Sequence, residues 1–234
     1  MGKLPILMYH NVSLAKSDGL TISVELLEEQ FKYLVAKGYR TYHLKELMNL
    51  NMLPSKKNIV ITFDDGYVSQ LELAIPLLKK YKLKATFFVP LNFLGKTDQW
   101  NTSFYPIMTA EQLKEIDQEH IELAYHSFYH KKYDELTHSN IEDDTQLCFD
   151  SVANTNLLFT MAVAYPYGKY PRTKTAKNTF IEHLKGRQFK YGLRIGNRLN
   201  TFPFKKPFEI QRIDVKGEFS LHTFKRRLCW GKWF

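Results

Sequence analysis

Cysteine is scarce in this chain, and long apolar runs are absent. The two cysteines, Cys148 and Cys229, lie far apart and form no CxxC pattern, which argues against a disulfide framework and a thiolate zinc site. No apolar run approaches the ~18 to 20 residues that a membrane-spanning helix needs. The first residues have too short an apolar core for a signal peptide. We therefore expect a cytoplasmic protein, or an extracellular or cell-surface protein if a leader has been removed.

Acidic residues are scarce in the C-terminal part. The chain has 33 Lys plus Arg against 24 Asp plus Glu, a net charge of +9. Residues 165–234 hold 17 Lys plus Arg and 4 Asp plus Glu, a balance of +13, which leaves the first 164 residues at −4. This asymmetry indicates either a solvated basic face or peripheral contact with an anionic membrane or polymer surface. We expect no nucleic-acid partner.

The pattern of apolar residues predicts strands that alternate with helices along the whole chain. With 234 residues and 44% hydrophobic content, the chain can bury a full core, and we expect one domain over residues 1–234. The alternation favours an α/β fold built on a parallel sheet or barrel. Strands are expected at 4–9, 39–42, 59–64, 84–90, 120–124, 159–164, 191–195 and 208–215. Helices are expected after Ser23, around 44–50, after Gly66, from Thr109 through about Glu119, within 134–158, ending at Gly186, and after Ser220.

Asn58–Gly66 is the stretch around which the chain is organised. Ile59–Ile61 is typical of a strand buried on both faces, and it leads into the paired acids Asp64 and Asp65 and then Gly66. Adjacent carboxylates raise each other's pKa unless a cation neutralises one of them. Active sites of parallel α/β proteins lie at the carboxyl ends of strands. The alternative is a polar turn that closes the strand.

Other polar groups also follow predicted strands. His126 and His130 are spaced so that a helical turn or tight loop directs both imidazoles at one ion, and Asp65 adds a carboxylate. Two histidines and one acid suit zinc and also iron, cobalt or nickel, although single histidines often serve as polar packing residues. His10 and Tyr165–Gly168 each follow another strand. This convergence at one edge of the sheet favours a site.

Three motifs in this order are similar to those of a known family. Thr62–Gly66, His126–His130 and Ala164–Gly168 resemble the first three motifs of the polysaccharide deacetylases, also called the NodB-homology or carbohydrate esterase family 4 enzymes. The resemblance extends over roughly Leu4 to Leu228. It implies a single-domain, distorted (β/α)7-type barrel with a parallel sheet.

The resemblance also implies roles for residues. Asp64 would be the general base that activates water, the backbone N–H of Tyr167 would hold the oxyanion, and Pro166 would help to bind substrate. One divalent ion, zinc first and cobalt or nickel next, would be held by Asp65, His126 and His130.

The proton donor departs from the common pattern. Most members carry a histidine in a Leu-x-His motif near the C-terminus, where His222 is the late candidate here, but His222 falls on the polar side of the last predicted helix. Leu7–His10 instead resembles the circularly permuted branch that includes the poly-β-1,6-N-acetylglucosamine deacetylases. We therefore assign the donor to His10; the alternative is a histidine that merely ends a strand.

The third motif departs as well. Ala164 occupies a position where the common motif has an arginine that orients the base. The permuted branch has a similar late arginine, so we expect Arg212 to pair with Asp64. Without a partner, Asp64 would have a higher pKa and be a poorer base at neutral pH.

These features favour a metal-dependent hydrolase that removes acetyl groups from N-acetylhexosamine units of a glycan. Two alternatives remain: hydrolysis of another amide, such as a peptidoglycan sugar, a lipid-linked precursor or a small cyclic amide, and a glycan-binding or scaffolding protein without turnover. An iron oxygenase fits the ligands, but the α/β pattern disfavours it. Several aromatic residues offer faces to sugar rings without a specific assignment: Trp100, Tyr105, Tyr129 and Tyr170.

Overall fold

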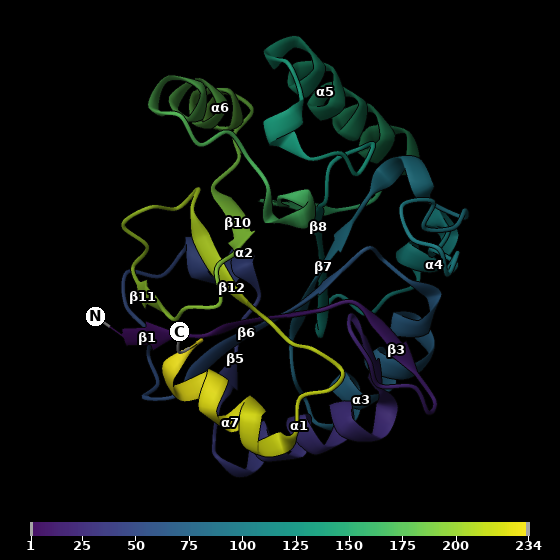
Figure 1. Cartoon of the computed structure of the whole chain (residues 1–234), viewed down its shortest axis with the longest axis vertical. Helices are drawn as coiled ribbons and strands as arrows, with labels where there is room; N and C mark the ends of the chain where they lie inside the picture. Colours follow the sequence, from purple (N-terminus) through teal and green to yellow (C-terminus); the bar gives the residue numbers. More distant parts are fainter. Residues whose placement is uncertain (1, 233–234) are drawn as a thin grey trace.

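The computed structural model, which describes residues 2–232, is an α/β barrel (Figure 1). Seven parallel strands follow one another around the barrel, and the last pairs with the first to close it. The predicted (β/α)7-type barrel is thus confirmed. In order around the barrel, the strands are β2 (Ile6–Tyr9), β6 (Asn58–Asp64), β7 (Ala85–Val89), β8 (Ile121–Tyr125), β9 (Phe159–Ala164), β10 (Tyr191–Ile195) and β12 (Ile210–Asp214).

Five short strands lie outside the ring of seven. β5 (Arg40–Thr41) lies parallel to the start of β6. β1 (Gly2–Leu4) pairs antiparallel with β11 (Asn200–Phe202), which brings two segments far apart in the sequence side by side. β3 (Asn11–Ser13) pairs with β4 (Thr21–Ser23). The sequence pattern did not predict β11, β3 or β4, because such three-residue strands are too short to show a period.

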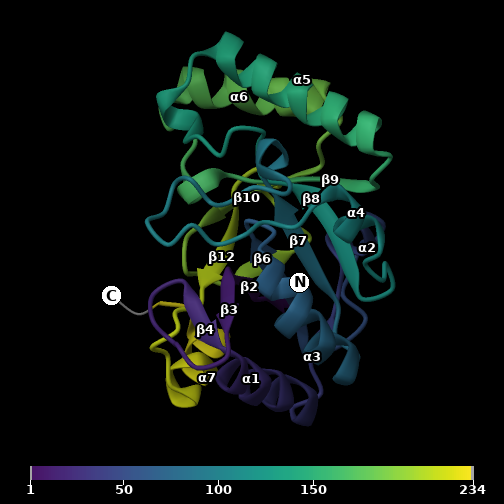
Figure 2. The ribbon, with the colours of Figure 1, turned by 90° about the vertical axis from the view of Figure 1, so that its right-hand side faces the viewer.

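Helices cover the outside of the barrel. The views agree that α5 and α6 lie side by side at one end of the molecule, while α1, α3 and α7 lie at the other (Figures 1 and 2). The helices are α1 (Val24–Ala36), α2 (Leu44–Met48), α3 (Ile75–Lys80), α4 (Ala110–Lys114), α5 (His138–Thr155), α6 (Lys174–Gly186) and α7 (Leu221–Trp230). A π-helical turn, η1 (Gln70–Ala74), precedes α3, and 3₁₀ turns occur at η2 (Leu91–Phe93), η3 (Tyr133–Glu135) and η4 (Pro166–Gly168).

Strand alternation determines which side chains enter the barrel. Successive side chains of a strand point to opposite faces, and one buried cluster collects the inward positions Ile6, Val60, Phe88, Ala124 and Ile210. Outward neighbours such as Leu7, Ile59 and Ile61 pack in another cluster with α1 and α3. The next inward side chain of a strand lies two residues further on, at the carboxyl end of the barrel.

Two predicted helices differ in the structure. The helix expected to run through Glu119 ends at Lys114, because the Asp117 carboxylate accepts a hydrogen bond from Glu119 N and makes a turn that competes with the helix. The helix expected after Gly66 begins as the π-helical turn η1. Pro76, at the start of α3, has no N–H to donate, and proline and π-turns are common sources of helix irregularity.

The basic C-terminal part does not form one continuous element. Of its 17 lysines and arginines, three lie on α6 and three on α7, two helices at opposite ends of the molecule (Figure 2), and the other eleven lie on strands and in loops. Contact with an anionic surface remains a prediction. No helix within residues 2–232 is long and apolar enough to cross a membrane.

Candidate active site

The carboxyl end of the barrel holds a cavity of about 220 Å³. Strand alternation explains why it is polar: Asp64 follows the inward residues Val60 and Thr62 of β6, and Arg212 follows Ile210 of β12. His10 and His126 stand one residue beyond β2 and β8, in the same alternation. Seven of the eight predicted site residues line this cavity: His10, Asp64, Asp65, His126, His130, Tyr167 and Arg212.

Asp65, His126 and His130 form one buried cluster whose candidate ligand atoms all lie within 4.8 Å of one another. Asp65 Oδ1 is 3.5 Å from His126 Nε2 and 3.3 Å from His130 Nε2. Despite these neighbours, Asp65 Oδ1 has no hydrogen-bond partner among residues 2–232. A buried carboxylate oxygen that faces two imidazole nitrogens without hydrogen bonds fits a cation between them.

His126 is held in the tautomer that a metal ligand needs. Its Nδ1 lies 2.8 Å from the Ala164 carbonyl oxygen, and only a protonated Nδ1 can donate there. The neutral imidazole then presents the Nε2 lone pair to the cluster. Such a second hydrogen bond commonly orients histidine ligands. The alanine that replaces the motif arginine therefore contributes its backbone oxygen to the site.

Burial and charge act against each other on these groups. Burial raises the pKa of Asp65. The interactions of its carboxylate with His126 and His130 lower the pKa by more, so it lies well below the ordinary value. Burial lowers the pKa of His126, but Asp64 and Asp65 reverse this and raise it. For His130, burial prevails and the pKa is lowered.

Four residues in or beside the cluster have backbone dihedral angles in the left-handed region. Asp65 has φ 72°, Ser127 has φ 63°, His130 has φ 52° and Tyr167 has φ 58°. Residues other than glycine rarely adopt this conformation, because it costs roughly 1 to 2 kcal/mol of free energy per residue. Such conformations cluster at functional sites. A tight loop, not a helical turn, therefore brings His126 and His130 together.

Arg212 forms the predicted ion pair with Asp64. Its two terminal nitrogens lie 2.6 and 2.7 Å from the two carboxylate oxygens, and both side chains are buried. A second bond, 3.3 Å long, joins Arg212 to the Thr62 hydroxyl. Burial raises the pKa of Asp64, but the charge of Arg212, with His126 and His10, lowers it below the ordinary value. Asp64 is therefore ionised at neutral pH.

His10 faces the same carboxylate. Its Nε2 lies 3.9 Å from Asp64 Oδ2, and its side chain is 11% exposed. Gln70, from η1, donates one hydrogen bond to the His10 carbonyl and one to the Asp64 carbonyl, so it joins the ends of β2 and β6. His222 is exposed on α7 and is not one of the described residues that line the cavity.

A loop closes the other side of the cluster. The Trp100 ring stacks on the His130 ring at 3.9 Å between centroids. Nearby, the fully buried Asp98 accepts hydrogen bonds from the Tyr67 hydroxyl and from Asn101. Burial, Asp65 and Asp98 all raise the pKa of Tyr67, which keeps its hydroxyl protonated. This network attaches the loop that carries Trp100 to the motif that carries Asp65.

Tyr167 lies beside the cluster, with its ring centroid 5.0 Å from that of His130. Its side chain is 44% exposed. Pro166, the eighth predicted residue, is buried in η4 and is not one of the described lining residues. It holds the turn that presents Tyr167 to the cavity.

Three supporting residues were not predicted from the sequence: Gln70, Asp98 and Asp144. Asp144 accepts hydrogen bonds from the backbone N–H groups of Phe128 and Tyr129, inside the histidine loop. Asp144 could have been recognised in the sequence, because it lies on the apolar face of a predicted helix with Ile141 and Cys148. An acid on a buried face needs a hydrogen-bond or charge partner. Gln70 and Asp98 left none, since their partners are set by the packing of loops.

Comparison with known proteins identifies the family of this chain. The family model described as polysaccharide deacetylase matches residues 52–182. YxkH of Bacillus subtilis (strain 168), named as a polysaccharide deacetylase, is 34% identical over 174 residues, which span 72% of this chain and 58% of YxkH, less than two thirds of that relative. Staphylococcus aureus poly-β-1,6-N-acetyl-D-glucosamine N-deacetylase is 24% identical over 217 residues, 88% of this chain and 71% of that protein.

Solved structures share the fold. The Streptococcus pyogenes deacetylase PplD, in complex with acetate, superimposes with a TM-score of 0.80 at 22% identity and covers 97% of this chain and 98% of its own. IcaB from Ammonifex degensii gives a TM-score of 0.79 at 22% identity, with 98% and 97% covered. The family model and the B. subtilis relative establish that this chain belongs to the polysaccharide deacetylase family.

Proposed function

We propose that the protein is a metal-dependent hydrolase that removes acetyl groups from N-acetylhexosamine units of a glycan. The observation that carries the proposal is the convergence in one cavity of an ionised carboxylate, a three-ligand cluster and a histidine. Family membership and the activity for which the S. aureus relative is named support a glycan substrate.

Asp65, His126 and His130 would hold the ion. When bound, a divalent metal polarises the acetamide carbonyl and lowers the pKa of water. Two imidazoles and one carboxylate fit zinc, our first choice, and also cobalt or nickel.

Asp64 would act as the general base. It takes a proton from the attacking water while Arg212, bonded to both carboxylate oxygens, keeps it ionised and oriented. A new C–O bond then forms at the acetyl carbon. The backbone N–H of Tyr167, in the turn that Pro166 begins, would donate to the oxygen that gains negative charge.

His10 would act as the general acid. It donates a proton to the amine nitrogen as the C–N bond breaks, which releases acetate and leaves a free amino group on the sugar. Its Nε2 lies 3.9 Å from Asp64, so acid and base face the same substrate atoms. His10 Nδ1 is buried without a hydrogen-bond partner in the described part of the chain.

Acetate release from a panel of N-acetylated glycans, together with metal analysis of the protein, tests the proposal. We expect release that stops with a chelator and returns with zinc. The Asp64→Asn protein should lose about 10²- to 10⁴-fold in rate, the usual worth of such a group.

The same panel separates the alternatives. Peptidoglycan fragments, lipid-linked sugars and small cyclic amides test for another amide substrate. If the zinc- or cobalt-loaded protein binds a glycan but releases no acetate, the protein is a glycan-binding member of the family and the proposed activity is wrong.

A further inference from the structure

The two candidate histidine ligands differ in how their rings are held. His126 donates a hydrogen bond from Nδ1 to the Ala164 carbonyl oxygen at 2.8 Å. His130 Nδ1, in contrast, is buried and has no hydrogen-bond partner among residues 2–232. Histidine ligands almost always donate their second N–H to a carboxylate, a carbonyl or water, and this bond fixes the orientation of the ring. The His130 imidazole lacks such a bond to the described protein.

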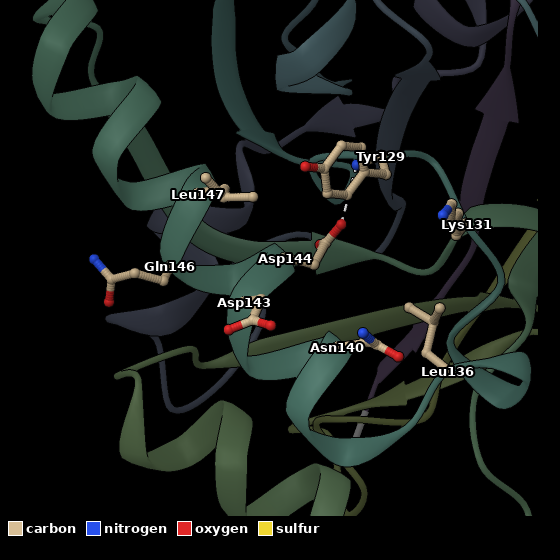
Figure 3. Close-up of a pocket in the computed structure, with 8 residues that line it drawn as sticks. All are labelled: Tyr129, Lys131, Leu136, Asn140, Asp143, Asp144, Gln146 and Leu147. Atoms are coloured by element: carbon tan, nitrogen blue, oxygen red, sulfur yellow. Dashed lines mark hydrogen bonds between the residues drawn. The ribbon is translucent and has the colours of Figure 1, made fainter.

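The backbone around His130 is fixed, so only its ring is left to rotate. His130 N donates to the Ser127 hydroxyl at 2.8 Å, and Asp144 on α5 accepts a hydrogen bond from Tyr129 N at 3.0 Å (Figure 3). These bonds hold peptide groups and do not touch the imidazole. Rotation about χ1 or χ2 would still move His130 Nε2 away from Asp65 Oδ1, which now lies 3.3 Å from it.

Trp100 supplies the contact that the His130 ring otherwise lacks. The two rings stack with 3.9 Å between their centroids and 27° between their planes. Phe93 packs against the indole with its ring nearly perpendicular, at 4.8 Å and 84°. Because an indole lies flat against one face of the imidazole, turning the imidazole edge-on would drive its atoms into the indole. The stack therefore restricts rotation about χ2 of His130.

The loop that carries Trp100 is attached to the motif that carries Asp65. Asp98, two residues before Trp100, is fully buried and accepts hydrogen bonds from the Tyr67 hydroxyl at 2.9 Å and from Asn101 Nδ2 at 2.8 Å. Tyr67 follows Asp65 by two residues. The indole is thus held relative to the same motif that provides the carboxylate of the cluster.

A bound cation would strengthen the stack. An imidazole that coordinates a divalent ion loses electron density to it and becomes partly positive. The face of an indole attracts positive charge more strongly than that of any other aromatic side chain. A contact that is stronger with the ion than without it raises the affinity for the ion, since only differential interactions shift such an equilibrium.

We propose that Trp100 is a positioning residue whose stacked ring holds the His130 imidazole in the orientation that binds the metal. The aromatic contact takes the part at His130 that a hydrogen bond takes at His126. This inference rests on the ion site of the proposed function.

The experiment measures zinc affinity by competition with a chelator, in the absence of any substrate. Trp100→Leu removes the stacked ring, and Trp100→Phe keeps an aromatic face. Trp230→Leu is the matched control, because Trp230 is 62% exposed on α7 and is not one of the described residues that line the cavity. Circular dichroism melting without metal checks that each variant folds.

We expect Trp100→Leu to weaken zinc binding about tenfold, within the usual range for the loss of a group that orients a ligand. Trp100→Phe should recover most of this loss, because a phenyl face still stacks on the imidazole. Trp230→Leu should bind zinc as the wild type does.

Cobalt(II) gives a second readout, which a change in stability alone would not move. A bound cobalt ion quenches the fluorescence of an indole close to it. Saturation with cobalt should therefore remove a larger share of the tryptophan emission from the wild-type protein than from Trp100→Phe.

Wild-type zinc affinity in Trp100→Leu would overturn this inference and leave the proposed function intact. The inference also fails if Trp100→Phe loses as much affinity as Trp100→Leu, if Trp230→Leu loses as much, or if cobalt quenches the wild type and Trp100→Phe equally. A wild-type protein that binds no zinc or cobalt would overturn both the inference and the metal dependence of the proposed function.

Discussion

Arg212 illustrates how one buried side chain determines the ionisation of another, the carboxylate of Asp64. The guanidinium is 1% exposed and donates to both oxygens of Asp64 and to Thr62. Its carbon also lies 5.3 Å from the Phe88 ring, a cation–π distance. Buried pairs are not reliable sources of net stability, but removing one partner leaves an uncompensated charge.

Replacing Arg212 with methionine should shift the acidic limb of the pH–rate profile to higher pH. The pKa of Asp64 is now below its ordinary value, so the base stays ionised until the pH falls below that lowered pKa. Without the arginine cation the pKa of Asp64 rises, so its carboxylate is protonated at a higher pH than in the wild-type protein. The check is kcat/KM measured across the acidic and neutral pH range.

Arg212→Lys should shift the acidic limb less than the methionine variant does. Lysine keeps the positive charge but cannot bind both carboxylate oxygens in the bidentate geometry of arginine. Urea unfolding should show a loss of about 3 to 5 kcal/mol for the methionine variant. An acidic limb that stays in place would reject the role of Arg212.

His10 and His222 give a second residue-scale prediction. His10→Ala should lower kcat about 10²- to 10⁴-fold, since no proton reaches the leaving amine. His222, exposed on α7, should tolerate alanine with near wild-type turnover. Acetate release from the same glycan measures both, and the reverse result would move the acid to His222.

At the scale of elements, the loop that follows β8 depends on α5. Ser127 and His130 both have positive φ, and the Ser127 hydroxyl accepts a hydrogen bond from His130 N at 2.8 Å. Asp144 holds the same loop through Phe128 N and Tyr129 N, at 3.0 to 3.1 Å. Burial raises the pKa of Asp144 above its ordinary value, although these N–H groups oppose it. The helix thus fixes the geometry of two candidate metal ligands.

Asp144→Ala should weaken zinc binding by about 10- to 100-fold, the usual effect of losing a group that orients a ligand. Two partly buried N–H groups would lose their acceptor, and the loop would relax. Competition with a zinc chelator measures the affinity without reference to catalysis.

Asp150→Ala, at an exposed acid on the same helix, serves as the control and should bind zinc as the wild type does. If Asp144→Ala retains full affinity, the loop is held by other contacts and the prediction is wrong.

At the scale of the whole molecule, the candidate site and a buried hydrogen-bond network around Glu122 lie at opposite ends of the barrel. Glu122, on β8, points inward near the amino ends of the strands and is 4% exposed. Its carboxylate accepts hydrogen bonds from Leu44 N and Lys45 N of α2 and from the hydroxyls of Thr86 and Thr160. One side chain therefore joins three strands and a helix, opposite the cavity.

Glu122→Leu should destabilise the protein by roughly 3 to 6 kcal/mol, because several buried donors lose their acceptor. The kcat of the folded fraction should not change, since the site lies at the other end of the barrel. Guanidinium unfolding and acetate release test the two statements separately.

Glu115→Leu, a change at an exposed residue just after α4, should alter stability by less than about 0.5 kcal/mol. Equal effects of the two leucine variants would show that Glu122 does not join the barrel in this way.

The sequence by itself determined which polar residues follow the strand ends. An apolar run that stops at a polar group is a local property, so the order of residues alone predicts Asp64, His126 and His10 at one edge of a parallel sheet. The resemblance to a family then suggested a pair between Arg212 and Asp64, which periodicity alone cannot encode.

Tertiary structure decided the rest. Three contacts join segments far apart in the chain: the pairing of β12 with β2, the hydrogen bonds of Gln70 to two strand ends and the packing of Trp100 on His130. Such contacts depend on how loops and helices pack once the barrel has closed, and a local pattern of residues carries no record of that geometry.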